Sequence, residues 1–99
     1  METIADSEQI IQLAGHEEIH ALRQMLAQTE APRLLFVVPE RHPAFDGLLP
    51  LKLLVRQAHA SGVQLALVTR DGNVRALGKR LKLSVFRSVG AARAARRWR

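Results

Sequence analysis

The sequence predicts a single α/β domain over residues 1–99, a three-layer, Rossmann-like arrangement of a mainly parallel four-stranded sheet and about four helices. Two observations carry this prediction. Short apolar runs rich in β-branched residues alternate with segments of helical periodicity, which is the pattern of βαβ units. The 99 residues, of which 47% are hydrophobic, suffice for one modest core and not for two.

The first half of the chain begins the alternation. Residues 8–14 are a partly apolar strand candidate, and residues 16–29 have helical spacing, with Ile19, Leu22 and Leu26 on one face. Residues 33–39 form a continuous apolar run of the kind buried on both faces of a parallel sheet. We therefore expect this run to be an inner strand.

The second half repeats the pattern. Its segments are a loop at 40–47, a helix from Pro50 to about Ala60, a strand at 63–69, a turn at 70–73, a helix at 74–82, a strand at 83–89 and a basic terminal helix or linker at 90–99. The run 63–69 is strongly apolar, so we expect it to be the second inner strand. The strand order does not follow from the sequence.

Capping residues mark several of these boundaries. Gly62 is placed to end the helix that starts near Pro50, because glycine readily adopts the left-handed conformation of a helix C-terminus. Asp71 or Asn73 can cap the next helix, and Ser88 can cap the last one. Residues 1–7 are a candidate flexible end.

The composition excludes some classes of protein. The chain has no cysteine, so it can form neither disulfides nor a thiolate zinc site. No apolar run approaches the roughly 18 residues of a membrane span, and the acidic N-terminus does not resemble a signal peptide. The cytoplasm is the expected location.

Charge is unevenly distributed along the chain. Residues 1–50 contain eight acidic and three basic residues, a net charge of −5, whereas residues 51–99 contain one acidic and twelve basic residues, a net charge of +11. Such segregation favours an acidic partner or an anionic surface near the second half. Alternatively, folding mixes the two halves and neutralises much of the asymmetry.

The stretch GHEEIH contains the pattern HExxH, with His16, Glu17 and His20. On a helix this spacing brings two imidazoles to one zinc ion and provides a glutamate as general base. A third ligand is missing from the continuation ALRQML, and the helical wheel places both histidines off the buried stripe. We therefore predict no metal site, exposed histidines, and a role for Glu17 and Glu18 at the helix N-terminus.

Ligands of parallel α/β sheets bind beyond the carboxyl ends of the strands. The polar side chains expected there include a candidate ligand-binding set for a small anion or nucleotide: Arg41, His42, Arg70 and Asp71. Polar loops occur at these ends in any such fold, and the glycine-rich phosphate-binding motifs GxGxxG and GxxxxGK[ST] are absent. The sequence predicts no catalytic residues and no cofactor.

The C-terminus is rich in arginine. Its candidate polyanion contacts are Arg93, Arg96, Arg97, Trp98 and Arg99. As a helix, this segment could contact nucleic-acid phosphates or an anionic membrane with Trp98 at the interface. The alternative is a solvated terminal helix.

The run from RLLFVVPE through LVTRDGN to VFRSVGAA resembles a small α/β domain at the N-terminus of bacterial multidomain membrane proteins that carry a phage baseplate-J-like region. The resemblance covers nearly the full length and brings no catalytic residues. It implies that RAARRWR is a basic segment on the cytoplasmic side of a membrane span, provided that the natural chain continues beyond Arg99.

These observations predict a non-enzymatic interaction or regulatory module of a larger bacterial protein. The candidate partners are a protein or an anionic surface. Two alternatives stay open, which are polyanion binding through the arginine-rich C-terminus and small-anion or nucleotide binding at the ends of the strands.

Overall fold

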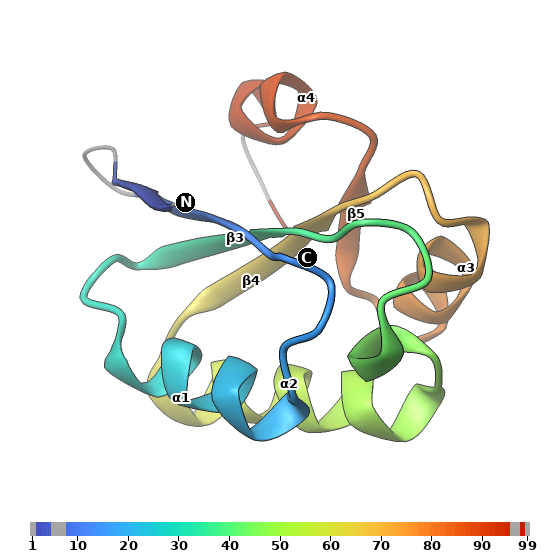
Figure 1. Ribbon diagram of the computed structural model, residues 1–99. Helices are drawn as coiled ribbons and strands as arrows, with labels where there is room; N and C mark the ends of the chain where they lie inside the picture. Colours follow the sequence, from blue (N-terminus) through green and yellow to red (C-terminus); the bar gives the residue numbers. More distant parts are fainter. Residues whose placement is uncertain (1, 5–7, 96–97, 99) are drawn as a thin grey trace.

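The computed structural model describes residues 2–4, 8–95 and 98, and it confirms the predicted α/β class (Figure 1). The elements, in chain order, are β1 (Glu2–Ile4), β2 (Glu8–Gln12), α1 (Ile19–Gln28), β3 (Arg33–Val37), the 3-10 helix η1 (Pro43–Phe45), α2 (Leu48–Ser61), β4 (Gln64–Val68), α3 (Gly72–Arg80), β5 (Ser84–Phe86) and α4 (Val89–Ala94).

Within the described residues the sheet has five strands, in the order β1-β2-β3-β4-β5. Strands β2 to β5 are parallel, as predicted, and the runs expected to be inner strands are β3 and β4. Strand β1 is an addition that pairs antiparallel with β2, with Thr3 opposite Ile10. Residues 2–4 of the candidate flexible end form this strand, whereas residues 1 and 5–7 lie outside the described part.

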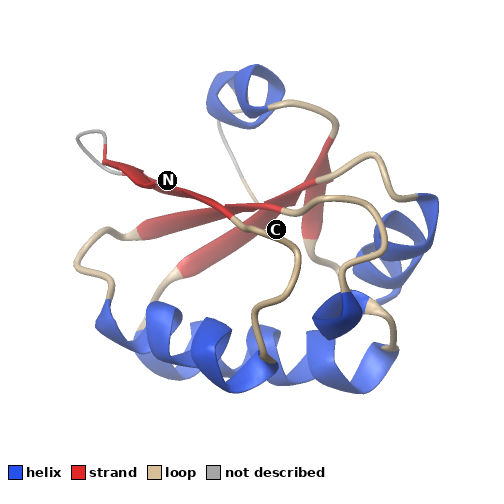
Figure 2. Ribbon diagram, viewed as in Figure 1, coloured by secondary structure: helices blue, strands red, loops and turns tan. Residues whose placement is uncertain are grey.

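The strand order determines where the helices lie. Parallel strands are almost always joined by right-handed crossovers, so a sheet whose strands follow the chain in one direction receives its crossover helices on a single face. Figure 2 shows α1, α2 and α3 on one side of the sheet and α4 on the other. The predicted three layers are therefore present, with the third layer formed by α4.

The larger core lies between the sheet and the three crossover helices. Because side chains of a strand alternate between its faces, Leu34 and Phe36 of β3 point into this core with Leu65 and Leu67 of β4. The helices contribute buried leucines from their inner faces: Leu22 and Leu26 of α1, and Leu51 and Leu54 of α2.

A smaller core lies on the other face of the sheet. Here the alternate residues Leu35, Ala66 and Val68 pack against Ala92 of α4 and against Trp98, whose side chain is buried. The indole Nε1–H donates to the carbonyl of Ala92 at 3.1 Å. Helix α4 and Trp98 thus supply the apolar cover of this face.

Local signals placed three helix ends correctly. Gly62 ends α2 in the left-handed conformation with φ 67°, Asp71 caps α3 by accepting from the amides of Asn73 and Val74, and Ser88 caps α4 by accepting from Ala91. In the segment 90–99, expected to be a basic terminal helix or linker, α4 ends at Ala94 and Ala95 is extended (φ −73°, ψ 127°). Arg96, Arg97 and Arg99 lie outside the described residues.

Candidate functional site

The carboxyl ends of β2 to β5 meet at one edge of the parallel sheet, as predicted, and their loops form a polar rim. The structure joins Arg41 and Asp71 there through the backbone, because the Arg41 amide donates to Oδ2 of Asp71 at 3.0 Å. Arg41 itself has φ 62°, a left-handed conformation that is uncommon for a residue with a side chain. This turn directs the amide towards Asp71 and leaves the guanidinium exposed.

Asp71 uses its carboxylate within the fold. The hydrogen bond from the Arg41 amide is the largest influence on it and lowers the pKa of Asp71; burial opposes this, and the amides of Asn73 and Val74 and the charge of Arg41 lower the pKa further. The carboxylate therefore holds the loop after β3 against the start of α3, and its two oxygens are already engaged.

His42 belongs to the interior and not to the rim surface. Its side chain is fully buried, with an edge-to-face contact to Phe45 at 5.0 Å between ring centroids. Nδ1 accepts from the amide of Ala44 at 3.2 Å, so Nε2 carries the proton of the neutral ring and donates to Oε1 of Glu17 at 2.9 Å. Both nitrogens are occupied, which corrects the expectation that His42 contacts a ligand.

Glu17 is the residue that sequence reasoning placed wrongly. Helix α1 begins at Ile19 and its first turn contains no acidic residue, so Glu17 lies in the preceding loop. Its oxygens accept from the amides of Ala14 at 2.6 Å and Gly15 at 3.1 Å and from His42. Burial, the largest influence, opposes ionisation, but these hydrogen bonds outweigh it and lower the pKa of Glu17 from 4.5 to about 2.

The HExxH pattern consequently does not lie on one helix. His16 precedes α1, His20 lies in its first turn, and both side chains are exposed, as predicted. Among the described residues no cluster of three histidine, aspartate or glutamate side chains could hold a metal ion. The glutamate of the pattern instead connects the loops after β2 and β3.

A small pocket remains at the rim. It has a volume of about 260 Å³ and lies at the ends of β3 and β4, lined by Arg70, Arg87, Glu40 and the buried Thr69, among others. Arg70 was a predicted ligand residue, and Arg87 joins it from the end of β5. In open parallel α/β sheets, ligands bind at the carboxyl ends of the strands, at the point where the strand order reverses. The order β2-β3-β4-β5 does not reverse, so the sheet lacks this usual binding point among the described strands.

The C-terminal arginine segment also differs from the expectation. Trp98 is only 5% exposed, and the guanidinium of Arg33 lies 3.8 Å from its ring centroid. Arg93 lies with Nε 3.7 Å from Oε1 of the buried Glu8, which also pairs with Arg33 at 3.6 Å. The indole ring of Trp98 is therefore covered and cannot contact a nucleic-acid base or a lipid headgroup. The side chain of Arg93 takes part in an ion pair with the buried Glu8.

Several exposed cations take part in no ion pair within the described residues, among them Arg23, Arg41, Lys52 and Arg56, and a further set of cations lies near β5. Helix α3 and the loops that flank α3 and β5 carry a set that we call the basic edge: Arg70, Arg75, Lys79, Arg80, Lys82 and Arg87. Arg75 is half-buried and the other five are exposed. Within residues 8–95 and 98, Glu8 pairs with Arg33 and Arg93, and Glu17 accepts a hydrogen bond from His42. None of these contacts involves the basic edge.

The strand order explains this grouping. Because the strands succeed one another across the sheet in chain order, the acidic first half lies towards β1 and the basic second half lies towards β5. The charge asymmetry of the sequence thus becomes an asymmetry in space, except that α4 brings Arg93 back to Glu8. The cations of the second half were visible in the sequence, but their place in the fold, beside β5, depended on the strand order.

Two further observations concern the whole chain. Within the described residues, no helix is long and apolar enough to cross a membrane. No protein-family model, no curated protein and no solved structure matches the sequence or the fold.

Proposed function

We propose that this protein is a non-enzymatic interaction module that binds an anionic partner through the basic edge. The observation that carries the proposal is the set of six cations at one end of the sheet, none of which takes part in an ion pair within the described residues. Clustered charge of one sign attracts and orients an oppositely charged macromolecule.

The distribution of the acidic groups supports this role. Asp71, the one acidic residue among positions 51–99, is engaged by the Arg41 amide and by the start of α3. Glu8 is likewise engaged with Arg33, and Glu17 with His42. The acidic residues that the structure places near the basic edge, Asp71 next to Arg70 and Glu40 in the rim pocket with Arg70 and Arg87, are fewer than its six cations.

A charge-reversal experiment tests the proposal. The protein is titrated into a fluorescent heparin fragment, and binding is compared for wild type, for Lys79→Glu with Arg80→Glu in the basic edge, and for Lys52→Glu with Arg56→Glu on the exposed face of α2. Both double variants change the net charge equally. We expect the edge variant to weaken binding about tenfold or more. The slope of log K against log salt concentration should also become shallower, because two cation contacts are lost.

The control defines the outcome that refutes the proposal. If the α2 variant loses as much affinity as the edge variant, binding follows the net charge of +6 and not the basic edge. Absence of heparin binding by the wild type at low salt would also exclude the proposal.

A second candidate function is small-anion binding at the rim pocket, favoured by the presence of Arg70 and Arg87 in one pocket of about 260 Å³. A thermal-shift screen with phosphate, nucleotides, sugar phosphates and zinc tests it. Stabilisation by phosphate that is lost in Arg70→Gln with Arg87→Gln would establish the pocket as an anion site. Stabilisation by a nucleotide or a sugar phosphate that is lost in the same double variant would extend the site to that class of anion.

We also propose that the module belongs to a larger, membrane-anchored bacterial protein of the kind that the sequence resembles. The support is the resemblance of RLLFVVPE, LVTRDGN and VFRSVGAA together with the basic C-terminal residues. The gene sequence downstream of Arg99 tests the idea, since a stop codon at that point would refute it.

A further inference from the structure

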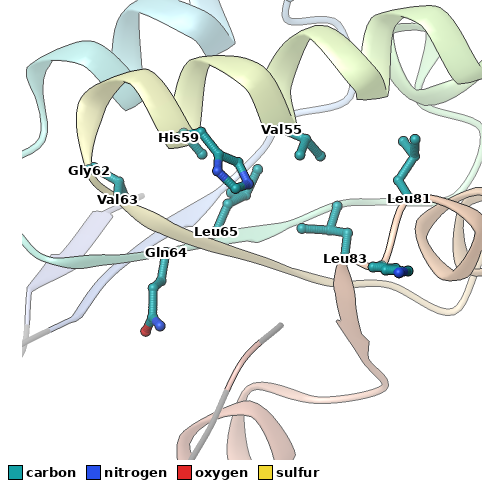
Figure 3. A pocket seen from close by; sticks show the side chains of 10 residues that line it. Val55, His59, Gly62, Val63, Gln64, Leu65, Leu81 and Leu83 are labelled. Carbon is teal, nitrogen blue, oxygen red and sulfur yellow. The ribbon is translucent and has the colours of Figure 1, made fainter.

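Two hollows lie next to each other at the β5 end of the sheet. The first, which we call the apolar groove, has a volume of about 650 Å³ and lies between the end of α2 and the beginnings of β4 and β5. Figure 3 shows the side chains of Val55, Leu81 and Leu83 converging on it, whereas Gln64 points away. Its lining is mainly aliphatic and also includes His59 and Lys82.

The second hollow, the basic groove, has a volume of about 530 Å³ and lies between α3 and β5. Arg75 and Lys79 are one helical turn apart on the α3 wall, and Val85 and Phe86 form part of the strand wall. Leu83 lines both grooves, so that they meet at this residue. Together they form a trough that follows the outermost strand.

The backbone of this strand has polar groups directed into the trough. The amide of Thr69 donates to the carbonyl of Phe86 at 3.0 Å, so the polar groups of Phe86 face β4. In a parallel ladder the next residue directs its amide and carbonyl to the opposite side. Those of Val85 therefore point to the open edge, where an added strand would receive main-chain hydrogen bonds.

We propose that the trough binds an acidic, extended peptide segment of a partner protein, with an aliphatic side chain in the apolar groove and carboxylates against Arg75, Lys79 and Lys82. This inference rests on the proposed function and names the partner of the basic edge. The partner segment should be acidic because the trough carries positive charge. It should be extended because the outward amide and carbonyl of Val85 can pair with the main chain of an added strand.

The apolar groove distinguishes this occupant from two others. An aliphatic side chain gains free energy when it leaves water for this groove, whereas a sugar-phosphate backbone does not. A second copy of the protein cannot add its own β5, because two basic edges would repel each other. The same repulsion protects the free edge from random strand pairing and leaves it open to an acidic segment.

Two fluorescent peptides test the inference. One alternates Glu and Leu over about 8 residues, roughly the length of a strand, and the other replaces each Leu with Ser at unchanged charge. We expect the Leu peptide to bind about tenfold or more tightly than the Ser peptide. In amide chemical-shift mapping on the wild type, the Leu peptide should move the signals of Leu81, Leu83 and Val85.

A variant that fills the apolar groove gives an independent check. Val55→Phe adds bulk from α2 without changing charge, so it should reduce binding of the Leu peptide to the level of the Ser peptide and leave heparin binding unchanged. Should this variant misfold, the chemical-shift map decides the question alone.

The possible contrary results are distinguishable. Equal affinity for both peptides means that charge alone acts, which overturns the inference and leaves the proposed function standing. Single-stranded DNA that binds more tightly than the Leu peptide and shifts the same amides overturns it in favour of nucleic acid. Failure of heparin and of both peptides to bind overturns the proposed function itself.

Discussion

Gly78 is the point at which α3 and β5 come into close contact. A Cβ atom added there would lie 2.5 Å from Cγ2 of Val85, a separation that packed atoms do not tolerate. Valine has little rotamer freedom with which to move away. Helix α3 can therefore rest on the strand only because residue 78 has no side chain.

The variant Gly78→Ala should be destabilised by about 1–3 kcal/mol through overpacking, although alanine is the better helix former by about 1 kcal/mol. Chemical denaturation measures the free energy of unfolding. In the double variant Gly78→Ala with Val85→Ala, the two effects should be non-additive, since the second change removes the clash. Strict additivity would show that the two residues do not meet.

Glu17 makes the stability of the fold depend on pH. Its pKa lies at about 2 in the folded state and at 4.5 ordinarily, so the unfolded chain binds the proton more tightly. The stability contributed by Glu17 is therefore fully present above about pH 4.5 and is lost as the pH falls towards 2.

The variant Glu17→Gln should be less stable by about 1–3 kcal/mol at neutral pH, because it weakens charge-assisted hydrogen bonds to two amides and His42. It should also lose part of the decline in stability between pH 4.5 and 2, as measured by urea unfolding. The adjacent Glu18→Gln is the matched control, since Glu18 is exposed and makes no capping hydrogen bond. A similar loss in both variants would contradict the assignment.

At this scale, local contacts were predictable and distant ones were not. Asp71, Ser88 and Gly62 each act within a few residues of their own position, where sequence preference is strong. Glu17 and His42 are 25 residues apart. Their pairing depends on β2 and β3 being neighbours, so the sequence indicated only a generic helix-start role for Glu17.

Among the elements, α4 and the residue Trp98 behave as one unit that covers the second face of the sheet. Trp98 is the one tryptophan of the chain. Its ring centroid lies 6.3 Å from that of Phe86, and the guanidinium of Arg33 stacks over its ring. The intrinsic fluorescence of the protein therefore reports on this contact.

We expect the tryptophan emission of the folded protein to be blue-shifted and poorly quenched by iodide, and to move to the red on unfolding. Trp98→Ala should cost about 3–5 kcal/mol, the range for loss of a buried aromatic side chain. The control is Leu49→Ala, which removes a leucine that is 67% exposed and should change stability little. Emission typical of free tryptophan in the native state would contradict the burial.

The element-scale predictions failed where segments were short. Strand β1 has three residues and pairs through a brief antiparallel return, too little for a periodicity to be recognised. Alanine and arginine both favour helix, which is why the sequence predicts a terminal helix beyond Ala94. The structure ends α4 at Ala94, and Trp98 packs against the sheet.

For the whole molecule, the grouping of like charges at the basic edge opposes folding. The Debye length falls from about 30 Å at 0.01 M salt to about 10 Å at 0.1 M, so added salt should weaken the repulsion among these cations. We expect the melting temperature to rise when NaCl is increased over this range, as followed by circular dichroism. The variant Lys79→Gln with Arg80→Gln should respond less steeply. A fall in melting temperature would indicate that attractive pairs such as Glu8 with Arg33 dominate instead.

The strand order could not be derived because several orders satisfy the same alternation of strands and helices. The position of the basic edge and the trough beside β5 depends on that order. The candidate site therefore lay beyond sequence reasoning, even though its charged residues were all visible in the sequence.

The order in which the strands succeed one another also has a consequence for how the protein acquires its fold. Each parallel strand pairs with the strand that precedes it in the chain, so each pairing closes one strand–helix–strand unit and none requires residues from a distant unit. As the chain leaves the ribosome, β2 to β4 with α1 and α2 can assemble before the later residues are synthesised. Helix α4 and Trp98 would then close over the second face of a sheet that has already formed.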